Sequence, residues 1–440
     1  DDEFSTITEY NIVDNEQLGK TLNNLQSSHF TNLQVLRAKN CGGNLNGFLD
    51  ILMKKSNKLE VLHIEQCQTL RFVFEVNDVT DDGVEDGKYF TEIKELKLIE
   101  LDQLERIWND PGGGNPVRVY GFRNLQMIHI RSCRSLSLML KSSVAEELHQ
   151  LNELKLEACE WLREVVDRSW DIYERIPIIK FPALSKVEFK SLSRLRWFYE
   201  YQLEFPSLKT LMIEKCPQFE NFAAGFATSN ESSITDEKSF PELNELKLDS
   251  CHKMVVVVSS ETLQELGNLK KLSVSHCNDL KRIFKIRGEI SLPTKLLQEL
   301  DELILIDLPK LTHIINMEIA KFYENLQILQ VKECKSLTWL PMSLMLTTME
   351  ISDCKALQKI IIISEEEEAG GKTIFPQLKD VTLENLKNLS VVFPSTSEFP
   401  SLETLKVENC PSLMTFVDEE SSMSKDRPEP STSNYFFPKT

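Results

Sequence analysis

One pattern of apolar and polar positions recurs along most of the chain, and it reads L-x-x-L-x-[LIV]-x-x-C-x-x-L. Counted from its first apolar residue, offsets 0, +3 and +5 are apolar, and the last two point to the same side of an extended chain. Each copy therefore predicts one short β-strand with one buried face. The fourteen copies begin at Leu33, Leu59, Ile93, Leu125, Leu151, Leu184, Leu208, Leu243, Leu269, Leu300, Leu326, Leu346, Leu378 and Leu402.

The spacing of the copies predicts how they assemble. Successive copies begin 20 to 35 residues apart, which is the period of a repeat array. One copy cannot bury its apolar side alone, but stacked copies can. We therefore expect residues 30–417 to form an α/β solenoid, a horseshoe or arc with a parallel β-sheet on its concave face. The convex side should consist mostly of loops or short helices.

The two ends of the chain depart from the pattern. Residues 1–29 contain no clear copy and are expected to be a degenerate repeat or an N-terminal junction. Residues 418–440 are rich in serine, proline and charge, which predicts a disordered tail. Because neither end shows a polar cap, we expect the chain to continue in a larger protein, at least before Asp1.

Offset +8 holds either a thiol or a leucine and never a charged residue, which indicates a buried apolar pocket at the end of each strand. Stacked copies would place these side chains in a row, and buried reduced thiols fit a reducing cytosol. The sequence thus favours a cytoplasmic protein whose cysteines are structural. The residues at offset +8 are Cys41, Cys67, Leu101, Cys133, Cys159, Leu192, Cys216, Cys251, Cys277, Leu308, Cys334, Cys354, Leu386 and Cys410.

The return path of each coil is predicted from two features. Phenylalanine stands three residues before eight of the copies, where its ring can fill the back of the coil. The variable length falls after offset +11, so we expect surface loops there, with room for a short helix at 143–149. The expected loops cover residues 72–89, 108–121, 163–180, 223–239, 281–296 and 359–374.

Charge and hydropathy limit the classes of partner. The formal net charge of −18 argues against nucleic acid or an anionic membrane, since either would require a basic surface. No apolar run approaches the roughly 18 residues of a membrane span. The acidic start of the chain is unlike a signal peptide.

Motifs for catalysis or cofactor binding are incomplete. Gly19–Thr21 and Gly371–Thr373 match the end of a phosphate-binding loop, but the glycine required five residues earlier is absent. Residues 78–89 begin like a calcium-binding loop, yet Tyr89 stands where the bidentate glutamate is needed. No histidine or cysteine spacing is typical of a metal site. We therefore expect neither an enzyme nor a cofactor or metal in this chain.

The outward side of the strands is the candidate binding surface, because solenoids usually bind partners on their strand face. Offset +4 forms a column of outward residues with five basic and two acidic members. Exposed apolar residues beside one another can form an interaction patch. The tryptophans at 108, 161, 197 and 339 are expected in the core or at its flank. The residues predicted to contact a partner are Met212, Lys247, Ile304, Ile306, Ile328 and Gln330.

The pattern resembles a leucine-rich repeat in which cysteine stands where other classes carry asparagine. Two copies, Phe205–Pro217 and Phe399–Pro411, both read F-P-S-L-x-T-L-x-[IV]-E-x-C-P. They look like the C-terminal repeats of plant intracellular disease-resistance receptors of the coiled-coil, nucleotide-binding, leucine-rich-repeat kind. The resemblance covers about residues 30–417.

This resemblance implies a function. In such receptors the repeat domain recognises a pathogen effector or a guarded host protein, and it restrains a nucleotide-binding domain until then. ADP or ATP would be bound by that other domain, whose motifs this chain lacks. The alternative is the substrate-recognition array of a ubiquitin-ligase adaptor, which uses similar repeats but spaces them more evenly. The scatter of 20 to 35 residues favours the receptor.

Overall fold

The predicted solenoid and its parallel sheet are confirmed in the computed structural model. The structure describes residues 7–15, 30–42, 45–55, 58–75, 92–109, 122–167, 178–199, 203–220, 240–259, 263, 266–285, 296–315, 324–362, 373–393 and 396–413. The predicted tail at 418–440 and most of residues 1–29 lie outside these ranges. The same is true of the incomplete calcium loop and of Gly19–Thr21.

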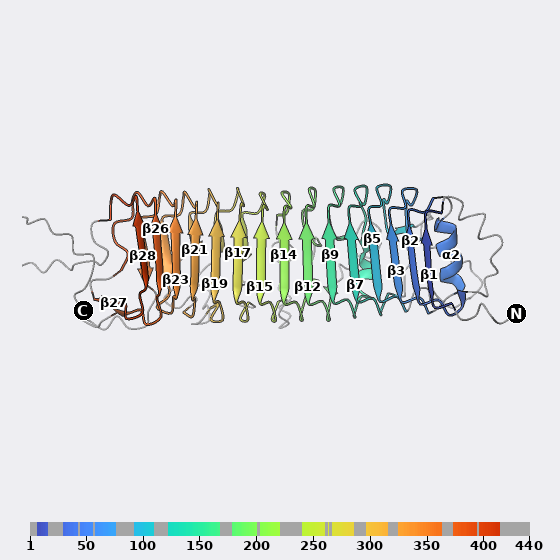
Figure 1. The fold of residues 1–440 in the computed structure, drawn as a ribbon, viewed down its shortest axis with the longest axis horizontal. Coiled ribbons are helices and arrows are strands. Elements are labelled where there is room, and N and C mark those ends of the chain that lie inside the picture. Colours follow the sequence, from blue (N-terminus) through green and yellow to red (C-terminus); the bar gives the residue numbers. More distant parts are fainter. Residues whose placement is uncertain are drawn as a thin grey trace, which may run out of the picture.

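Fifteen strands of five residues each form one large parallel sheet, in which every strand pairs with the strands of the neighbouring repeats. Figure 1 shows these strands in a single row along the long axis of the molecule. The strands are β1 (Glu9–Val13), β2 (Val35–Lys39), β3 (Val61–Glu65), β5 (Glu95–Ile99), β7 (Met127–Arg131), β9 (Glu153–Glu157), β12 (Lys186–Lys190), β14 (Thr210–Glu214), β15 (Glu245–Asp249), β17 (Lys271–Ser275), β19 (Glu302–Ile306), β21 (Ile328–Lys332), β23 (Thr348–Ser352), β26 (Asp380–Glu384) and β28 (Thr404–Glu408).

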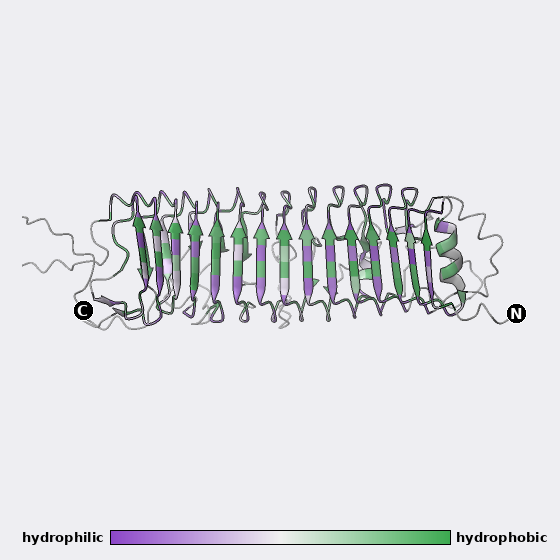
Figure 2. Cartoon of the chain, in the orientation of Figure 1, coloured by the Kyte–Doolittle hydropathy of each residue, from purple (hydrophilic) through white to green (hydrophobic). Residues whose placement is uncertain are grey.

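The register is the same at each interface of this sheet. Each strand covers offsets +2 to +6 of its copy, and residues of equal offset are partners, as Leu211 is with Val187 and Leu246. Residues at offsets +3 and +5 face the core, and those at +2, +4 and +6 face outward. Figure 2 shows the resulting alternation of hydrophobic and hydrophilic residues along the strands.

Strand β1 reveals a repeat that the sequence pattern does not show. Ile7 and Tyr10 pack against the core as offsets 0 and +3 would, and Ile12 is buried at offset +5. Asn15 occupies offset +8, where the other copies carry cysteine or leucine, and its carbonyl accepts a hydrogen bond from Gly42 at 3.1 Å. The large sheet therefore begins within the range that the sequence assigns to a degenerate repeat or junction.

The return side contains short parallel strands that the sequence does not predict. They occupy the first residues of several expected loops and the residues before some of the phenylalanines. The pairs are β4 (Phe74–Glu75) with β6 (Trp108–Asn109), β8 (Leu140–Lys141) with β10 (Val166–Asp167), β11 (Ile179–Lys180) with β13 (Leu203–Glu204), β22 (Trp339–Met342) with β24 (Lys359–Ile362), and β25 (Thr373–Ile374) with β27 (Ser397–Glu398); β16 (Val256–Ser259), β18 (Arg282–Lys285) and β20 (His313–Ile315) form a set of three.

Two helices lie on the return path. Helix α3 (Ser142–Ala145) falls at the predicted place but begins one residue earlier. Helix α2 (Leu45–Lys55) is not predicted, although its buried residues follow helical spacing. Those residues are Leu45, Phe48, Leu49 and Leu52.

The core is continuous along the array. Residues at offsets 0, +3, +5 and +8 are buried in every copy from Leu33 to Leu378, and the phenylalanines before the copies stack on one another, as Phe181 does on Phe205 with ring centres 5.6 Å apart. In the copy that begins at Leu402 the apolar residues are only partly buried. Strand β28 lies at the end of the described sheet and therefore has a neighbour on one side only.

The residue at offset +7 has a left-handed backbone in every copy. Its φ is between 49° and 57°, whether the residue is Asn40, Ala158 or His276. Its amide donates to a carbonyl of the next repeat, as the amide of Ala158 does to Lys190 at 2.9 Å. The tight turn that leads into offset +8 is therefore fixed by backbone geometry and not by residue type.

Ala158→Gly is expected to stabilise the protein. The left-handed conformation costs a β-carbon-bearing residue about 1–2 kcal/mol, and glycine loses about 0.5–1 kcal/mol in backbone entropy, so the net gain is roughly 0.5–1 kcal/mol. Urea unfolding followed by circular dichroism measures it. Ala145→Gly, in helix α3, is the control and should destabilise instead. A loss of stability in Ala158→Gly would contradict the strain argument.

Candidate functional site

The candidate site is the outward side of the large sheet, which we call the sheet face. Three rows of side chains run along it, at offsets +2, +4 and +6. We call the row at offset +4 the middle row. It consists of Arg37, His63, Lys97, His129, Lys155, Glu188, Met212, Lys247, Ser273, Ile304, Gln330, Glu350, Thr382 and Lys406.

Four of the six residues predicted to contact a partner lie in the middle row. Met212 on β14 is the register partner of Lys247 on β15, and Ile304 on β19 is the partner of Gln330 on β21. Ser273 on β17 stands between the two pairs. The structure therefore brings these residues together across five consecutive strands.

The apolar cluster at 304, 306 and 328 is less compact than the sequence suggests. Ile306 pairs with Lys332 and Ile328 pairs with Glu302, so Ile306 and Ile328 lie at opposite ends of neighbouring strands. Four residues of strand separate them, which is about 13 Å. Ile304 lies between them, and Ile328 is the most exposed of the three at 39%. The patch is a diagonal line centred on Ile304.

Basic residues of the middle row are largely paired with carboxylates of the same row or of the flanking rows. Lys247 lies 2.5 Å from Glu214, and Lys155 lies 3.2 Å from Glu188. The amide of Gln330 donates to Glu350 at 2.6 Å. Two predicted contact residues, Lys247 and Gln330, are thus held in place by neighbours on the sheet face.

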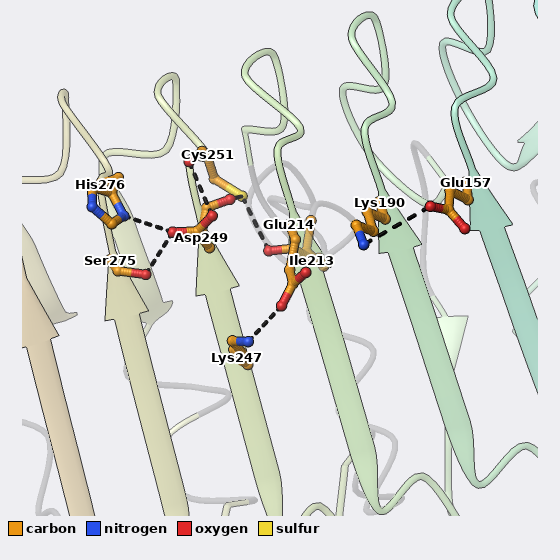
Figure 3. A network of polar contacts seen from close by, with 10 residues as sticks. Glu157, Lys190, Ile213, Glu214, Lys247, Asp249, Cys251, Ser275 and His276 are labelled. Atoms are coloured by element: carbon orange, nitrogen blue, oxygen red, sulfur yellow. Dashed lines mark hydrogen bonds and ion pairs between the residues drawn. The ribbon is translucent and has the colours of Figure 1, made fainter.

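The carboxyl ends of β14, β15 and β17 carry a connected network of polar contacts (Figure 3). Asp249 accepts hydrogen bonds from Ser275 and His276, each at 2.7 Å. Burial would raise the pKa of Asp249, but hydrogen bonds from Ser275, His276 and Ser250 lower it below its ordinary value. Asp249 is therefore ionised near neutral pH and fixes the edge beside Lys247.

A second feature of the sheet face is a hollow of about 250 Å³ over β1, β2, β3 and β5. The repeat pattern does not reveal this hollow, because side chains from four separate repeats form it. We call it the N-terminal groove. Its outward lining residues are Asn11, Val13, Arg37, Lys39, His63, Glu65, Lys97 and Ile99.

The cysteines are structural within the described residues. All ten are unbridged, and nine are fully buried. Burial raises the pKa of Cys67, Cys159 and Cys216 to about 12, so these thiols are protonated at neutral pH. Among the residues that the structure describes, no group of three or more histidine, cysteine or acidic side chains could hold a metal ion.

The tryptophans divide between core and surface. Trp108 is buried, as predicted, but Trp161 is 49% exposed. The guanidinium of Arg194, from the next repeat, lies 3.7 Å from the centre of the Trp161 ring. The sequence predicts Trp161 in the core or at its flank. Half of its surface is exposed, and Arg194 covers one face of its ring.

No helix in the described part of the chain is long and apolar enough to cross a membrane.

Comparison with known proteins finds one relative in sequence and several solved structures, of which two are described. The chain is 27% identical over 195 residues to the disease resistance protein SUMM2 of Arabidopsis thaliana, a match that covers 42% of this chain and 19% of that protein. The structure of the TLR13–ssRNA13 complex covers 88% of this chain and 65% of its own, at 12% identity and a TM-score of 0.25. A leucine-rich repeat protein from Bacteroides ovatus covers 87% of each chain, at 13% identity and a TM-score of 0.22.

The sequence also matches a known family of repeats. The family of plant disease resistance protein RPS2-like leucine-rich repeats matches residues 6–160, 227–345 and 342–426, which is most of the chain. The match at its start includes strand β1, the repeat that the sequence pattern does not show. The chain belongs to this family of plant disease-resistance leucine-rich repeats.

Proposed function

We propose that the chain is the protein-recognition domain of a plant intracellular immune receptor. It senses a pathogen effector or a guarded host protein through the sheet face, and it helps to hold a nucleotide-binding switch domain inactive. ADP or ATP binds to that switch domain and not to this chain. The receptor acts in the cytoplasm, and recognition there releases the restraint.

The observation that carries this proposal is the continuous sheet face in a chain of this family. Fifteen strands about 4.8 Å apart give a row roughly 70 Å long, and a strand of five residues is roughly 16 Å long. The face therefore covers on the order of 1,000 Å², comparable to the roughly 800 Å² that each partner buries in a standard protein interface. A surface of this size and mixed polarity suits a folded protein partner.

Repeat domains of this class generally serve as protein-binding modules, and the geometry here agrees with that role. The recurrent apolar residues are buried in every copy from Leu33 to Leu378, whereas the outward residues differ from strand to strand. The core thus provides a rigid support, and the rows on the sheet face provide specificity. A rigid core with variable outward residues favours partner recognition, and not catalysis, as the function of the chain.

Ile304→Glu is expected to weaken binding of the partner at least tenfold. A buried apolar residue at the centre of an interface commonly contributes about 2 kcal/mol or more, and a glutamate would be desolvated there without a counter-charge. The measurement is affinity capture of the chain from pathogen-challenged leaf tissue, followed by the Kd of each purified partner. Circular dichroism of the variant verifies that it is folded.

Ile374→Glu is the matched control, because Ile374 is 45% exposed but lies in β25, outside the large sheet. The same substitution there should leave the Kd unchanged. Equal affinity of wild type and Ile304→Glu would remove the middle of the sheet face from the interface. Equal loss in both variants would show that added negative charge, and not the patch, is responsible.

A further inference from the structure

We propose that the N-terminal groove binds an extended acidic segment of a partner protein, with carboxylates seated against Arg37 and Lys97. This proposal rests on the proposed function in one respect, because both take the sheet face as a binding surface. It names a second contact region, far along the array from Ile304, and the chemistry that this region recognises.

Two rows of side chains form the walls of the groove. Register places Asn11, Arg37, His63 and Lys97 side by side on one wall, and Val13, Lys39, Glu65 and Ile99 on the other. The groove therefore runs across the strands, between the middle row and the row at offset +6. A segment lying in it would cross four repeats at once.

The charge of the walls favours an acidic ligand. The lining residues include three fixed cations, Arg37, Lys39 and Lys97, and a single carboxylate, Glu65. This excess is opposite to the net charge of −18 for the whole chain. Electrostatic complementarity of this kind selects a partner and accelerates its association.

Existing ion pairs do not prevent such binding. Arg37 contacts Glu9, Lys39 lies 3.1 Å from Glu65, and Lys97 contacts Glu95. Glu9 and Glu95 stand outside the groove, in the row at offset +2. Because partly exposed ion pairs contribute little to stability, a ligand carboxylate can share or replace them.

The positive row extends beyond the groove. His129 and Lys155 follow Lys97 in register, and the Nε2 atom of His129 is buried without a hydrogen-bond partner. Burial lowers the pKa of His129, and the charges of Lys155, Lys97 and Arg131 lower it further. Burial also lowers the pKa of His63, although the hydrogen bond between its Nε2 atom and Glu95 raises it. The fixed charges of this part of the middle row are those of Arg37, Lys97 and Lys155.

Size and composition narrow the ligand to a peptide. A hollow of about 250 Å³ is smaller than the roughly 300–1,000 Å³ of sites for small-molecule ligands, but it admits one or two side chains. Val13, which is 58% exposed, and Ile99 offer apolar contacts at its two ends. No phenylalanine, tyrosine or tryptophan stands among the described residues that line the groove, so it lacks the large stacking platforms typical of sites for single-stranded nucleic acid.

Spacing also suits an extended segment. Arg37 and Lys97 are two strands apart, or about 10 Å, and alternate side chains of an extended peptide are about 7 Å apart. Both side chains are long enough to close that difference. The expected ligand therefore carries two acidic residues separated by one residue.

The test uses the full chain and a fluorescein-labelled peptide in which glutamate and valine alternate. A second peptide with glutamine in place of glutamate is the probe control. We expect fluorescence anisotropy to show binding of the glutamate probe only, with a Kd that rises with salt concentration. Arg37→Glu with Lys97→Glu should raise that Kd at least tenfold.

Lys406→Glu is the matched control variant, because Lys406 lies in the same row at the other end of the array. It should leave the Kd unchanged. Arg37→Gln, a milder change, should give an intermediate Kd and guards against misfolding of the charge-reversal variant. Equal binding of the two peptides, or an equal effect of Lys406→Glu, would overturn the proposal.

Tighter, Arg37-dependent binding of a single-stranded RNA probe would also overturn the proposal. Its failure is distinguishable from failure of the proposed function. If Ile304→Glu abolishes capture of a partner while the glutamate probe does not bind, the groove inference alone falls. If the probe binds at the groove while Ile304→Glu changes nothing, the interface assigned to the middle of the sheet face falls instead.

Discussion

Replacing Leu192 with aspartate is expected to unfold the middle of the array, whereas Leu192→Cys is expected to leave it folded. Leu192 is fully buried, and its neighbours at offset +8 are Cys159 and Cys216. An aspartate there must either bury a charge or bind a proton, and it must also leave part of the leucine volume empty. Together these effects cost on the order of 5 kcal/mol or more.

Leu192→Cys is the matched comparison, because cysteine occupies the same offset in ten of the fourteen copies. It keeps the site apolar and removes only part of the side chain, so the expected loss is about 1–3 kcal/mol. Urea unfolding followed by circular dichroism measures both variants. Similar midpoints for the aspartate and cysteine variants would mean that offset +8 does not require an apolar residue.

Raising the pH from 8 to 10 is expected to destabilise the reduced protein by about 4 kcal/mol through three thiols alone. Burial raises the pKa of Cys67, Cys159 and Cys216 from 9.0 to about 12. Because the folded pKa is the higher one, the unfolded chain loses these protons first. The stabilisation is complete below pH 9 and is lost progressively as the pH rises towards 12. At pH 10 each thiol accounts for about 1.4 kcal/mol.

A single substitution isolates the effect of one thiol from that of lysine and tyrosine titration. Cys216→Val removes one titrating group and keeps the site apolar. Its free energy of unfolding, measured by urea at both pH values under reducing conditions, should fall by about 1.4 kcal/mol less than that of the wild type. A fall of the same size in both proteins would show that the Cys216 thiolate is not disfavoured by burial.

Much of the fold was accessible from the sequence because one offset pattern defines the strand, its inward face and its register. All fourteen predicted strands lie in the large sheet, and the buried residue at offset +8 follows from the exchange of cysteine with leucine. The sequence assigns residues 1–29 to a degenerate repeat or a junction without giving its register, because the apolar signal there is weak. Tyr10 replaces an aliphatic residue and Asn15 replaces cysteine, so the offset pattern alone does not place it.

The left-handed backbone at offset +7 could not be predicted from the residues at that offset. Offset +7 is left-handed in every copy, yet it carries residues as different as Asn40, Ala158 and His276. Such a position is normally recognised by glycine or asparagine, and here stacking of the repeats imposes the conformation on other residues. The short strands of the return side are similarly set by alignment of neighbouring coils.

The candidate site was only partly accessible from the sequence. The pattern identified which residues face outward, so the middle row could be written down. It could not show that Lys247 is paired with Glu214, or that Ile306 and Ile328 lie apart, because both depend on cross-strand neighbours. The N-terminal groove depends on side chains of four repeats and was invisible for the same reason.

The uniform register has a consequence for how such a chain can change over generations. Because each strand contacts its neighbours through the same five offsets, any repeat can in principle pair with any other. In-frame duplication or loss of a whole unit would leave every remaining interface intact. It would also move all outward residues beyond it by one strand, so that two distant contact regions such as Arg37 and Ile304 acquire a new separation in a single genetic event.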